Sequence, residues 1–174
     1  FATDQRTMPA RPFTILLVRR RIGAPHWGKL IAGGRAIPCA IGRTGISAMK
    51  REGDGASPRG TFRLLGLWMR PDRPRIQSRL MKNRISPADG WCDAPGHRLY
   101  NQPVRRPFAA SHEAMWREDR LYDLVVDIAW NRGPIVKGRG SAIFMHAARE
   151  GFTATEGCVA LQAKDLRWLV QHVS

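Results

Sequence analysis

Several short stretches of the chain are either rich in apolar residues or alternate between apolar and polar ones, and both patterns are typical of β-strands. The stretches are residues 13–20, 30–42, 61–69, 121–130 and 143–145. Gly33-Gly34 interrupts the second of them, so we expect a hairpin with its turn at these two glycines. The pattern predicts about six strands and therefore a mainly β fold.

The end of the chain follows a helical period instead. After Lys164 the apolar positions are Leu166, Leu169, Val170 and Val173. This spacing predicts an amphipathic C-terminal helix whose apolar stripe packs against the core. Ser111 is a suitable N-cap for a second, short helix that would end at Trp116. The expected fold class is thus mainly β with short helices, one of them at the C-terminus.

The remaining segments predict one domain with an arm and a lobe. Residues 1–11 are polar and predict a flexible N-terminal arm, and residues 42–60, rich in Gly, Ser and charged side chains, predict a long loop. Residues 70–108 contain six prolines and no sustained period. A stretch of this kind is usually functional or a cover, so we expect an irregular lobe or lid over residues 70–118. The single folded domain would span residues 12–174.

The net charge indicates an anionic partner. The 174 residues include 29 Lys and Arg against 14 Asp and Glu, a formal net charge of +15. The arginines are spread through the chain, and guanidinium groups suit carboxylates and phosphates. Nucleic acid is not expected, because the sequence has no zinc-finger spacing, RNP-like motif or basic helix. A cell-wall glycan that carries carboxylates satisfies the charge.

Membrane insertion is not expected from the sequence. No apolar stretch approaches the length of a membrane-spanning helix. The chain begins at Phe1 without a signal-peptide pattern, so we expect a processed or trimmed form whose export signal is out of view. We expect a monomer.

His146 and Cys158 form the candidate catalytic pair. Cys158 stands in Thr155-Glu156-Gly157-Cys158, and His146 precedes it by twelve residues in a predicted buried strand. A thiol is a good nucleophile only as a thiolate, and a nearby imidazole is the commonest base for it. Gly157 allows a tight turn in which consecutive backbone N–H groups hold an oxyanion. The pair predicts an acyl-transfer site, with a buried structural cysteine as the alternative.

The other two cysteines carry weaker signals. Cys39 alternates with Ile37 and Ile41 and is predicted to lie in the core. Cys92 is the rival nucleophile, although neither a histidine nor a glycine turn adjoins it. A disulfide between Cys39 and Cys92, which would leave Cys158 free, is an open alternative. The sequence has no C-x-x-C and no H-x-x-x-H, so we expect no metal site.

Two segments far apart in the chain resemble motifs of one enzyme family. Residues 54–62, Asp-Gly-Ala-Ser-Pro-Arg-Gly-Thr-Phe, are similar to T/S-P-x-G-x-F. His146 followed by Thr155-Glu156-Gly157-Cys158 is similar to a histidine followed by S/T-x-G-C. These are motifs of the YkuD-type L,D-transpeptidases. The intervening segments that resemble a divergent branch of that superfamily are Trp91-Cys92-Asp93, Tyr100-Asn101, Leu121-Tyr122-Asp123 and Asn131-Arg132-Gly133-Pro134.

The resemblance covers residues 13–173 and implies a YkuD-like β-sandwich catalytic domain with the cysteine in a cleft. It implies attack on the bond after an L-configured centre of a peptidoglycan stem peptide, a thioester acyl-enzyme, and transfer to an amine of a neighbouring stem. The cross-links would be of the 3-3 or 1-3 type. Carbapenem-type β-lactams would acylate the cysteine, no cofactor would be needed, and the location would be the periplasm or the cell envelope.

The resemblance also suggests which groups orient the base. A backbone carbonyl often orients the histidine in the family, and Ser141 and Asp123 are further candidates for that role.

The His–Cys spacing is shorter than in many relatives. The chain has Ala160 where the family commonly has an arginine two residues after the cysteine.

Four residues are candidate substrate contacts. Glu156 stands where the family commonly has a histidine, and it would bind a substrate ammonium or form a local salt bridge. Thr155 adjoins it in the same motif. Asn131 and Arg132 resemble a segment that faces the cleft, with a solvated turn as the alternative. The alternative functions are an L,D-carboxypeptidase or exchange enzyme on the same stems, and a non-catalytic basic peptidoglycan-binding module.

Overall fold

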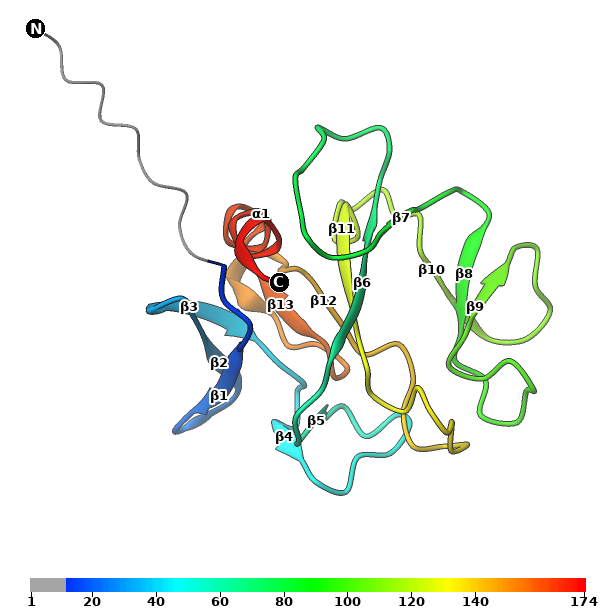
Figure 1. The fold of residues 1–174 in the computed structure, drawn as a ribbon. Coiled ribbons are helices and arrows are strands. Elements are labelled where there is room, and N and C mark those ends of the chain that lie inside the picture. The colour runs from blue at the N-terminus through cyan, green and yellow to red at the C-terminus, as the bar shows by residue number, and fades with distance from the viewer. Residues whose placement is uncertain (1–11) are drawn as a thin grey trace, which may run out of the picture.

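Figure 1 shows the fold, which the computed structural model describes for residues 12–174. Its main element is one mixed sheet of eight strands. In sheet order these are β1 (Leu17–Arg21), β2 (Ala24–Ala32), β3 (Arg35–Ala40), β13 (Val159–Leu161), β12 (Phe144–Ala147), β11 (Leu124–Ile128), β6 (Leu64–Met69) and β7 (Lys82–Arg84). Neighbouring strands are antiparallel, except that β12–β13 and β6–β7 are parallel. The expected arm at residues 1–11 lies outside the described residues.

The predicted hairpin is confirmed in β2 and β3. Ala32 pairs with Arg35, and the two glycines between them, Gly33 and Gly34, have φ angles of 52° and 78°. Positive φ at both central residues is a type I′ turn, which matches the twist of the flanking strands and which glycine adopts without strain. The apolar pattern located the turn correctly, although β2 begins earlier than the pattern indicated, at Ala24.

The mainly β class and the C-terminal helix are also confirmed. Helix α1 spans Ala163–His172 and buries Leu166, Leu169 and Val170, and the fourth predicted core position, Val173, is buried at its C-cap. A short 3-10 turn, η1 (Glu150–Phe152), lies in the connection between β12 and β13.

The short helix predicted over residues 111–116 is wrong. This segment contains a strand, β10 (His112–Ala114), that pairs antiparallel with β8 (Asp89–Cys92) and places Glu113 opposite Trp91. An N-cap contributes only about 1 kcal/mol, and helices of one or two turns are marginal without tertiary support. The hydrogen bonds to β8 therefore decide the structure of this segment.

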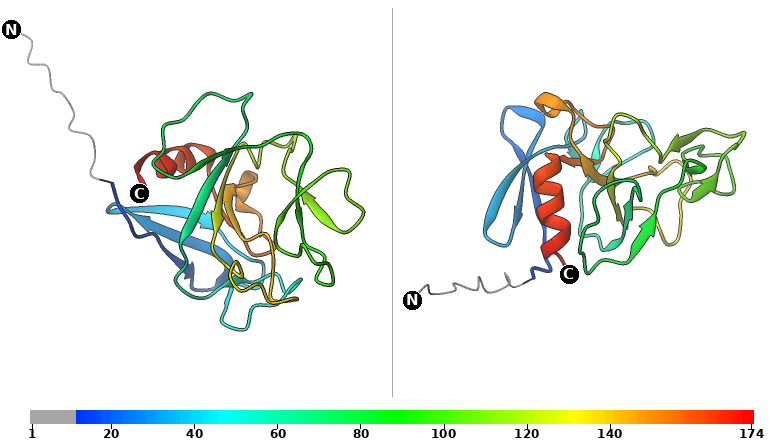
Figure 2. Two further views of the ribbon diagram at one scale, coloured as in Figure 1. Left: turned by 45° about the vertical axis from the view of Figure 1, so that its right-hand side comes forward. Right: turned by 90° about the horizontal axis from the view of Figure 1, so that it is seen from above.

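Residues 70–118, which we call the lobe, are more regular than the sequence indicated. Strands β8, β9 (Pro103–Arg105) and β10 form a three-stranded antiparallel sheet, and β7 extends the main sheet. A short parallel pair, β4 (Ile46–Ser47) and β5 (Ser57–Pro58), organises the predicted loop over residues 42–60. Figure 2 shows the green lobe sheet at one end of the molecule and the blue β1–β3 strands at the other.

The central strands of the main sheet are buried on both faces. On β12, Met145 belongs to the core that contains Leu169 of α1, whereas Phe144 belongs to a second core shared with the lobe. The Phe144 ring meets the ring of Trp91 edge to face, with centroids 4.9 Å apart. Because side chains alternate along a strand, the face of β12 that receives the lobe also carries His146.

Candidate active site

The parallel pairing of β12 and β13 brings the predicted base and nucleophile together. Met145 lies opposite Val159, and His146 lies opposite Ala160. Cys158 precedes Ala160 by two residues, so its side chain points to the same face of the sheet as the imidazole. With strands about 4.8 Å apart and a rise of about 3.3 Å per residue, the Cα atoms of His146 and Cys158 are on the order of 8 Å apart.

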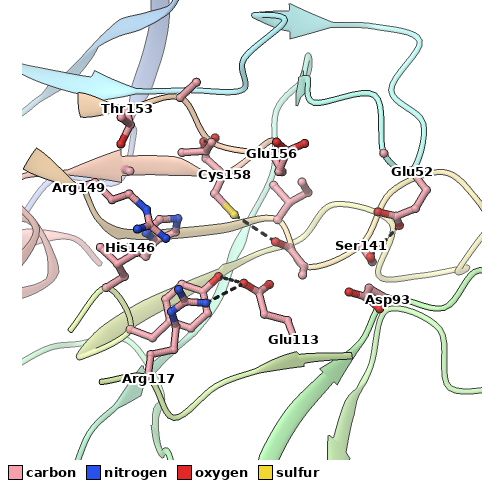
Figure 3. A pocket seen from close by; sticks show the side chains of 18 residues that line it. Glu52, Asp93, Glu113, Arg117, Ser141, His146, Arg149, Thr153, Glu156 and Cys158 are labelled. Carbon is pink, nitrogen blue, oxygen red and sulfur yellow. Dashed lines mark hydrogen bonds and ion pairs between the residues drawn. The ribbon is translucent and has the colours of Figure 1, made fainter. Parts of the chain in front are cut away.

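The two side chains line a pocket of about 510 Å³ between the main sheet and the lobe. Figure 3 shows that charged groups flank the thiol within this pocket. Arg117 and Arg149 lie on the side of His146, and Glu52 and Asp93 lie at the other end. The pocket is therefore polar, with cationic and anionic groups on opposite sides of the sulfur.

The Cys158 thiol is held by backbone groups. Its Sγ donates to the carbonyl oxygen of Ala142 at 3.2 Å and accepts from the N–H of Phe144 at 3.3 Å. Burial, followed by the negative charge of Glu113, raises the pKa of this thiol to about 12. The sequence predicts a shared hydrogen between thiol and imidazole, but residues 12–174 contain no hydrogen bond between them. In unliganded enzymes such hydrogen bonds are often long and tighten only around substrate.

The imidazole of His146 is oriented by the backbone. Its Nδ1 lies 2.8 Å from the carbonyl oxygen of Ala147, and because a carbonyl only accepts, Nδ1 carries the proton. The other nitrogen, Nε2, is then free to accept one. Burial lowers the pKa of His146 to about 4, so the ring is neutral at pH 7. The other two candidates act elsewhere: Ser141 donates to Glu52, and Asp123 pairs with arginines.

The turn before the nucleophile requires glycine. Gly157 has a φ of 141°, and a Cβ at this position would lie 2.7 Å from the carbonyl oxygen of Ala56. Ser57 then ties the turn to the upstream motif: its Oγ donates to the Gly157 carbonyl at 2.8 Å and accepts from the N–H of Gly42 at 3.0 Å. The two motifs that the sequence analysis singled out therefore meet at the nucleophile.

Thr155 and Glu156 lie on the same turn but have different surroundings. The hydroxyl of Thr155 donates to the Cys158 carbonyl at 2.7 Å and accepts from the Gly157 N–H at 3.2 Å, so it stabilises the turn. Glu156 is at the rim of the pocket, where its side chain is 75% exposed and pairs with Arg43 at 3.3 Å. The structure thus brings His146, Gly157, Cys158 and both of these residues into one region.

Asn131 and Arg132 are not among the residues that line the pocket. Asn131 Nδ2 donates to two carbonyl groups of its own loop, at 2.9 and 3.0 Å. Arg132 donates to the carbonyl of Asn101 at 2.7 Å and pairs with Asp127 at 3.3 Å. Arg132 thus connects the loop after β11 to the lobe, and its guanidinium group is paired rather than solvated.

One protein-family model, described as the L,D-transpeptidase catalytic domain (YkuD), matches residues 27–174. The chain belongs to this family. Proteins of the YkuD family act on peptidoglycan peptides. No curated protein and no solved structure shows significant similarity to the chain. Within residues 12–174, no helix has both the length and the apolar character needed to cross a bilayer.

The other two cysteines lie outside the candidate active site. Cys39 and Cys92 are both fully buried, neither lines the pocket, and all three cysteines are free, so the possible disulfide is not formed. Burial raises the pKa of Cys39 to about 12, as expected of a core residue. Of the three thiols, the one at position 158 alone lines this pocket.

The charged residues that surround His146 and Cys158 were not predicted from the sequence. Glu113 and Arg117 come from the lobe, and Arg149 follows β12. Tyr122 connects the two walls: its hydroxyl donates to Glu113 Oε1 at 2.6 Å, and its ring packs against His146 with centroids 5.2 Å apart. The incorrect helix prediction obscured Glu113, and a strand with its period of two would have assigned that residue to one face.

Proposed function

We propose that the protein is a cysteine-dependent peptidoglycan L,D-transpeptidase that cross-links stem peptides through a thioester on Cys158, with 3-3 or 1-3 linkages. One observation carries this proposal: in a chain of this family, the parallel register directs Cys158 and His146 into one pocket. Because the substrate is the cell wall, the enzyme would work in the periplasm or cell envelope, as a monomer.

Acylation begins from a neutral pair. With the pKa of Cys158 at about 12 and that of His146 at about 4, the proton stays on sulfur until a substrate carbonyl arrives. The thiol then turns from the Ala142 carbonyl toward Nε2 of His146, which accepts the proton while sulfur attacks the carbonyl carbon. His146 next donates that proton to the leaving amine, and the acyl group remains on Cys158 as a thioester.

The oxyanion formed in this attack needs hydrogen-bond donors near the sulfur. The N–H groups of Cys158 and Gly157 are the candidates, and the Gly157 N–H exchanges its 3.2 Å hydrogen bond to Thr155 for one to the oxyanion. Loss of one such donor raises the barrier by about 3–4 kcal/mol. The unusual φ of Gly157 supports this role, because it lets the backbone turn immediately before the nucleophile.

The charges around the thiol fit a stem peptide, which carries both carboxylates and ammonium groups. Arg117 and Arg149 are suited to carboxylates on the His146 side of the pocket. Glu52 and Asp93 are suited to an ammonium group at the other end. Glu156 at the rim is a further contact for the substrate.

One observation favours the non-catalytic alternative, a peptidoglycan-binding module. Cys158 is only 9% exposed as a residue, and the hydrogen bonds of its thiol go to backbone groups. A structural cysteine has this environment, whereas a thiolate-forming one has a lowered pKa. The two functions differ in whether the sulfur ever becomes covalently acylated.

The test is incubation with purified disaccharide-tetrapeptide, followed by mass spectrometry of the products, together with intact-mass measurement after exposure to a carbapenem. We expect cross-linked stems and one carbapenem adduct for the wild type, and neither for Cys158→Ala. Cys92→Ala is the matched control, since it removes a buried sulfur outside the pocket. Products from Cys158→Ala would refute the assignment, and a folded wild type with neither adduct nor product would favour the binding module.

A further inference from the structure

The lobe places one carboxylate at the centre of the pocket. Glu113 lies on β10, lines the pocket beside Cys158, and keeps 29% of its side-chain surface exposed. Its charge is close enough to the sulfur to contribute to the raised pKa of the thiol. An anion here disfavours the thiolate, so its presence needs a reason other than activation of the nucleophile.

The contacts of Glu113 leave one of its oxygens available. Tyr122 donates to Oε1 at 2.6 Å, and Arg117 lies 3.9 Å from the same atom. Among the described residues Oε2 has neither a hydrogen bond nor an ion pair, and Figure 3 shows the carboxylate pointing up into the pocket toward Cys158. The carboxylate is thus held in position at one oxygen and is open to a ligand at the other.

The groups that face Glu113 come from both walls. Arg117 and Tyr122 contact it, His146 and Cys158 lie across the pocket, and Asp93 and Asp119 are close enough to influence it. Desolvation raises the pKa of Glu113, which brings it closer to that of an amine. Asp93 adds an acceptor that is still unused, because its Oδ1 is buried and has no partner among residues 12–174. A cation that enters from the Asp93 end of the pocket meets the carboxylates of Asp93 and Glu113 before it reaches the Cys158 sulfur.

We propose that Glu113 binds the ammonium group of the acceptor and receives one of its protons, so that it decides whether the thioester passes to an amine or is lost to water. This inference rests on the proposed function. The acceptor class is therefore a primary amine that is protonated in solution. The carboxylates of the same acceptor would lie toward Arg117 and Arg149.

Transfer to the acceptor moves two protons away from its nitrogen. The acceptor R–NH₃⁺ gives a proton to the Glu113 carboxylate, and the resulting R–NH₂ attacks the thioester carbonyl carbon. The new C–N bond forms as the C–S bond breaks, and the bonding electron pair leaves on sulfur. The second proton of the nitrogen passes through His146 Nε2 to that sulfur. An amide, a Cys158 thiol and a protonated Glu113 result, and Glu113 then returns its proton to water.

Other acids in the pocket are less suited to this role. Glu156 is at the rim, more exposed, and already paired with Arg43. Glu52 accepts hydrogen bonds from both Tyr100 and Ser141 at the far end of the pocket. Glu113 alone among these three contributes to the raised pKa of Cys158.

The experiment measures two quantities for the wild type, Glu113→Gln, Glu113→Asp and Glu118→Gln. The first is carbapenem acylation of Cys158, by intact mass. The second is the ratio of cross-linked to hydrolysed stems from disaccharide-tetrapeptide. We expect Glu113→Gln to keep acylation and to lower the ratio at least about tenfold, the value of a charge-assisted hydrogen bond. Glu113→Asp keeps the charge and should retain more transfer than Gln, and Glu118→Gln, exposed and outside the pocket, should match the wild type.

Each outcome bears on the inference. An unchanged ratio in Glu113→Gln with acylation intact overturns it, as does a ratio in Glu113→Asp as low as that in Glu113→Gln. If Glu113→Gln loses acylation, the ratio is measured in Glu113→Asp instead. Loss of acylation in both variants would mean that Glu113 has a purely structural role and would overturn the inference. A folded wild type with neither an adduct on Cys158 nor any product instead refutes the proposed function itself, and this result is distinct from a changed ratio.

Discussion

The two walls of the pocket hold their functional groups in opposite ways. On the sheet wall His146 and Cys158 are 8% and 9% exposed, and burial keeps both neutral. On the lobe wall Glu113 and Arg117 are partly exposed and charged. A buried neutral pair is unreactive toward stray electrophiles, whereas open charges can recognise a zwitterionic peptide. Under the proposed function, the sheet carries the bond chemistry and the lobe selects what reaches it.

The largest expected effect is the loss of the base on the sheet wall. His146→Gln should lower the rate of transfer at least about a hundredfold while the protein stays folded, because general base catalysis is removed. Initial rates of product formation by mass spectrometry measure it. His172→Gln, at the end of α1 and outside the pocket, should leave the rate unchanged. A His146→Gln variant with near wild-type turnover would assign the base to another residue.

The second-largest effect is expected on stability, when the contact between Phe144 of the sheet wall and Trp91 of the lobe wall is removed. Phe144→Ala deletes a fully buried ring that packs against Trp91, and we expect the free energy of unfolding to fall by about 3–5 kcal/mol. Met145→Ala on the opposite face should cost about 2–5 kcal/mol. Only Phe144→Ala should also speed alkylation of Cys158, since it opens the lobe side. Equal alkylation rates in the two variants would show that the lobe does not shield the thiol.

The neutral imidazole should make stability depend on pH. The pKa of His146 is about 4 in the folded protein against an ordinary 6.5, so between these values the unfolded chain binds the proton more readily. The stability contribution is complete above pH 6.5 and declines toward pH 4, by up to about 3 kcal/mol. Chemical denaturation at a series of pH values would show a steeper decline for the wild type than for His146→Gln. Parallel curves would mean that His146 is not held neutral.

The smallest expected effect tests how the upstream motif supports the nucleophile. Ser57→Ala leaves the Gly157 carbonyl and the Gly42 N–H without their partner, which should cost about 1–3 kcal/mol and reduce turnover. Ser47→Ala is the control, because that hydroxyl accepts only from an exposed loop N–H and should change stability by less than about 0.5 kcal/mol. Thermal unfolding and initial rates measure both variants, and equal losses would remove the special role of Ser57.

Much of the sheet could be predicted, because several strands are short apolar runs and the turn between β2 and β3 contains two glycines. The hairpin at Gly33-Gly34 and helix α1 follow from local pattern alone. The strand β13 did not, although it places the nucleophile: only three residues long, Val159–Leu161, it has no period of its own. The lobe strands were missed for the same reason, since pairing between distant segments stabilises them rather than local preference.

The amino-acid sequence by itself determined the reactive atoms and the backbone freedom beside them. A thiol, an imidazole and a glycine before the thiol are properties of Cys158, His146 and Gly157 that need no fold to be recognised. Only the tertiary structure decided their state. The packing of the lobe against β12 buries the pair, keeps it neutral, and adds Glu113 from a strand remote in sequence. Charge and dielectric environment depend on neighbours in space, and those neighbours are chosen by the sheet pairing rather than by adjacency along the chain.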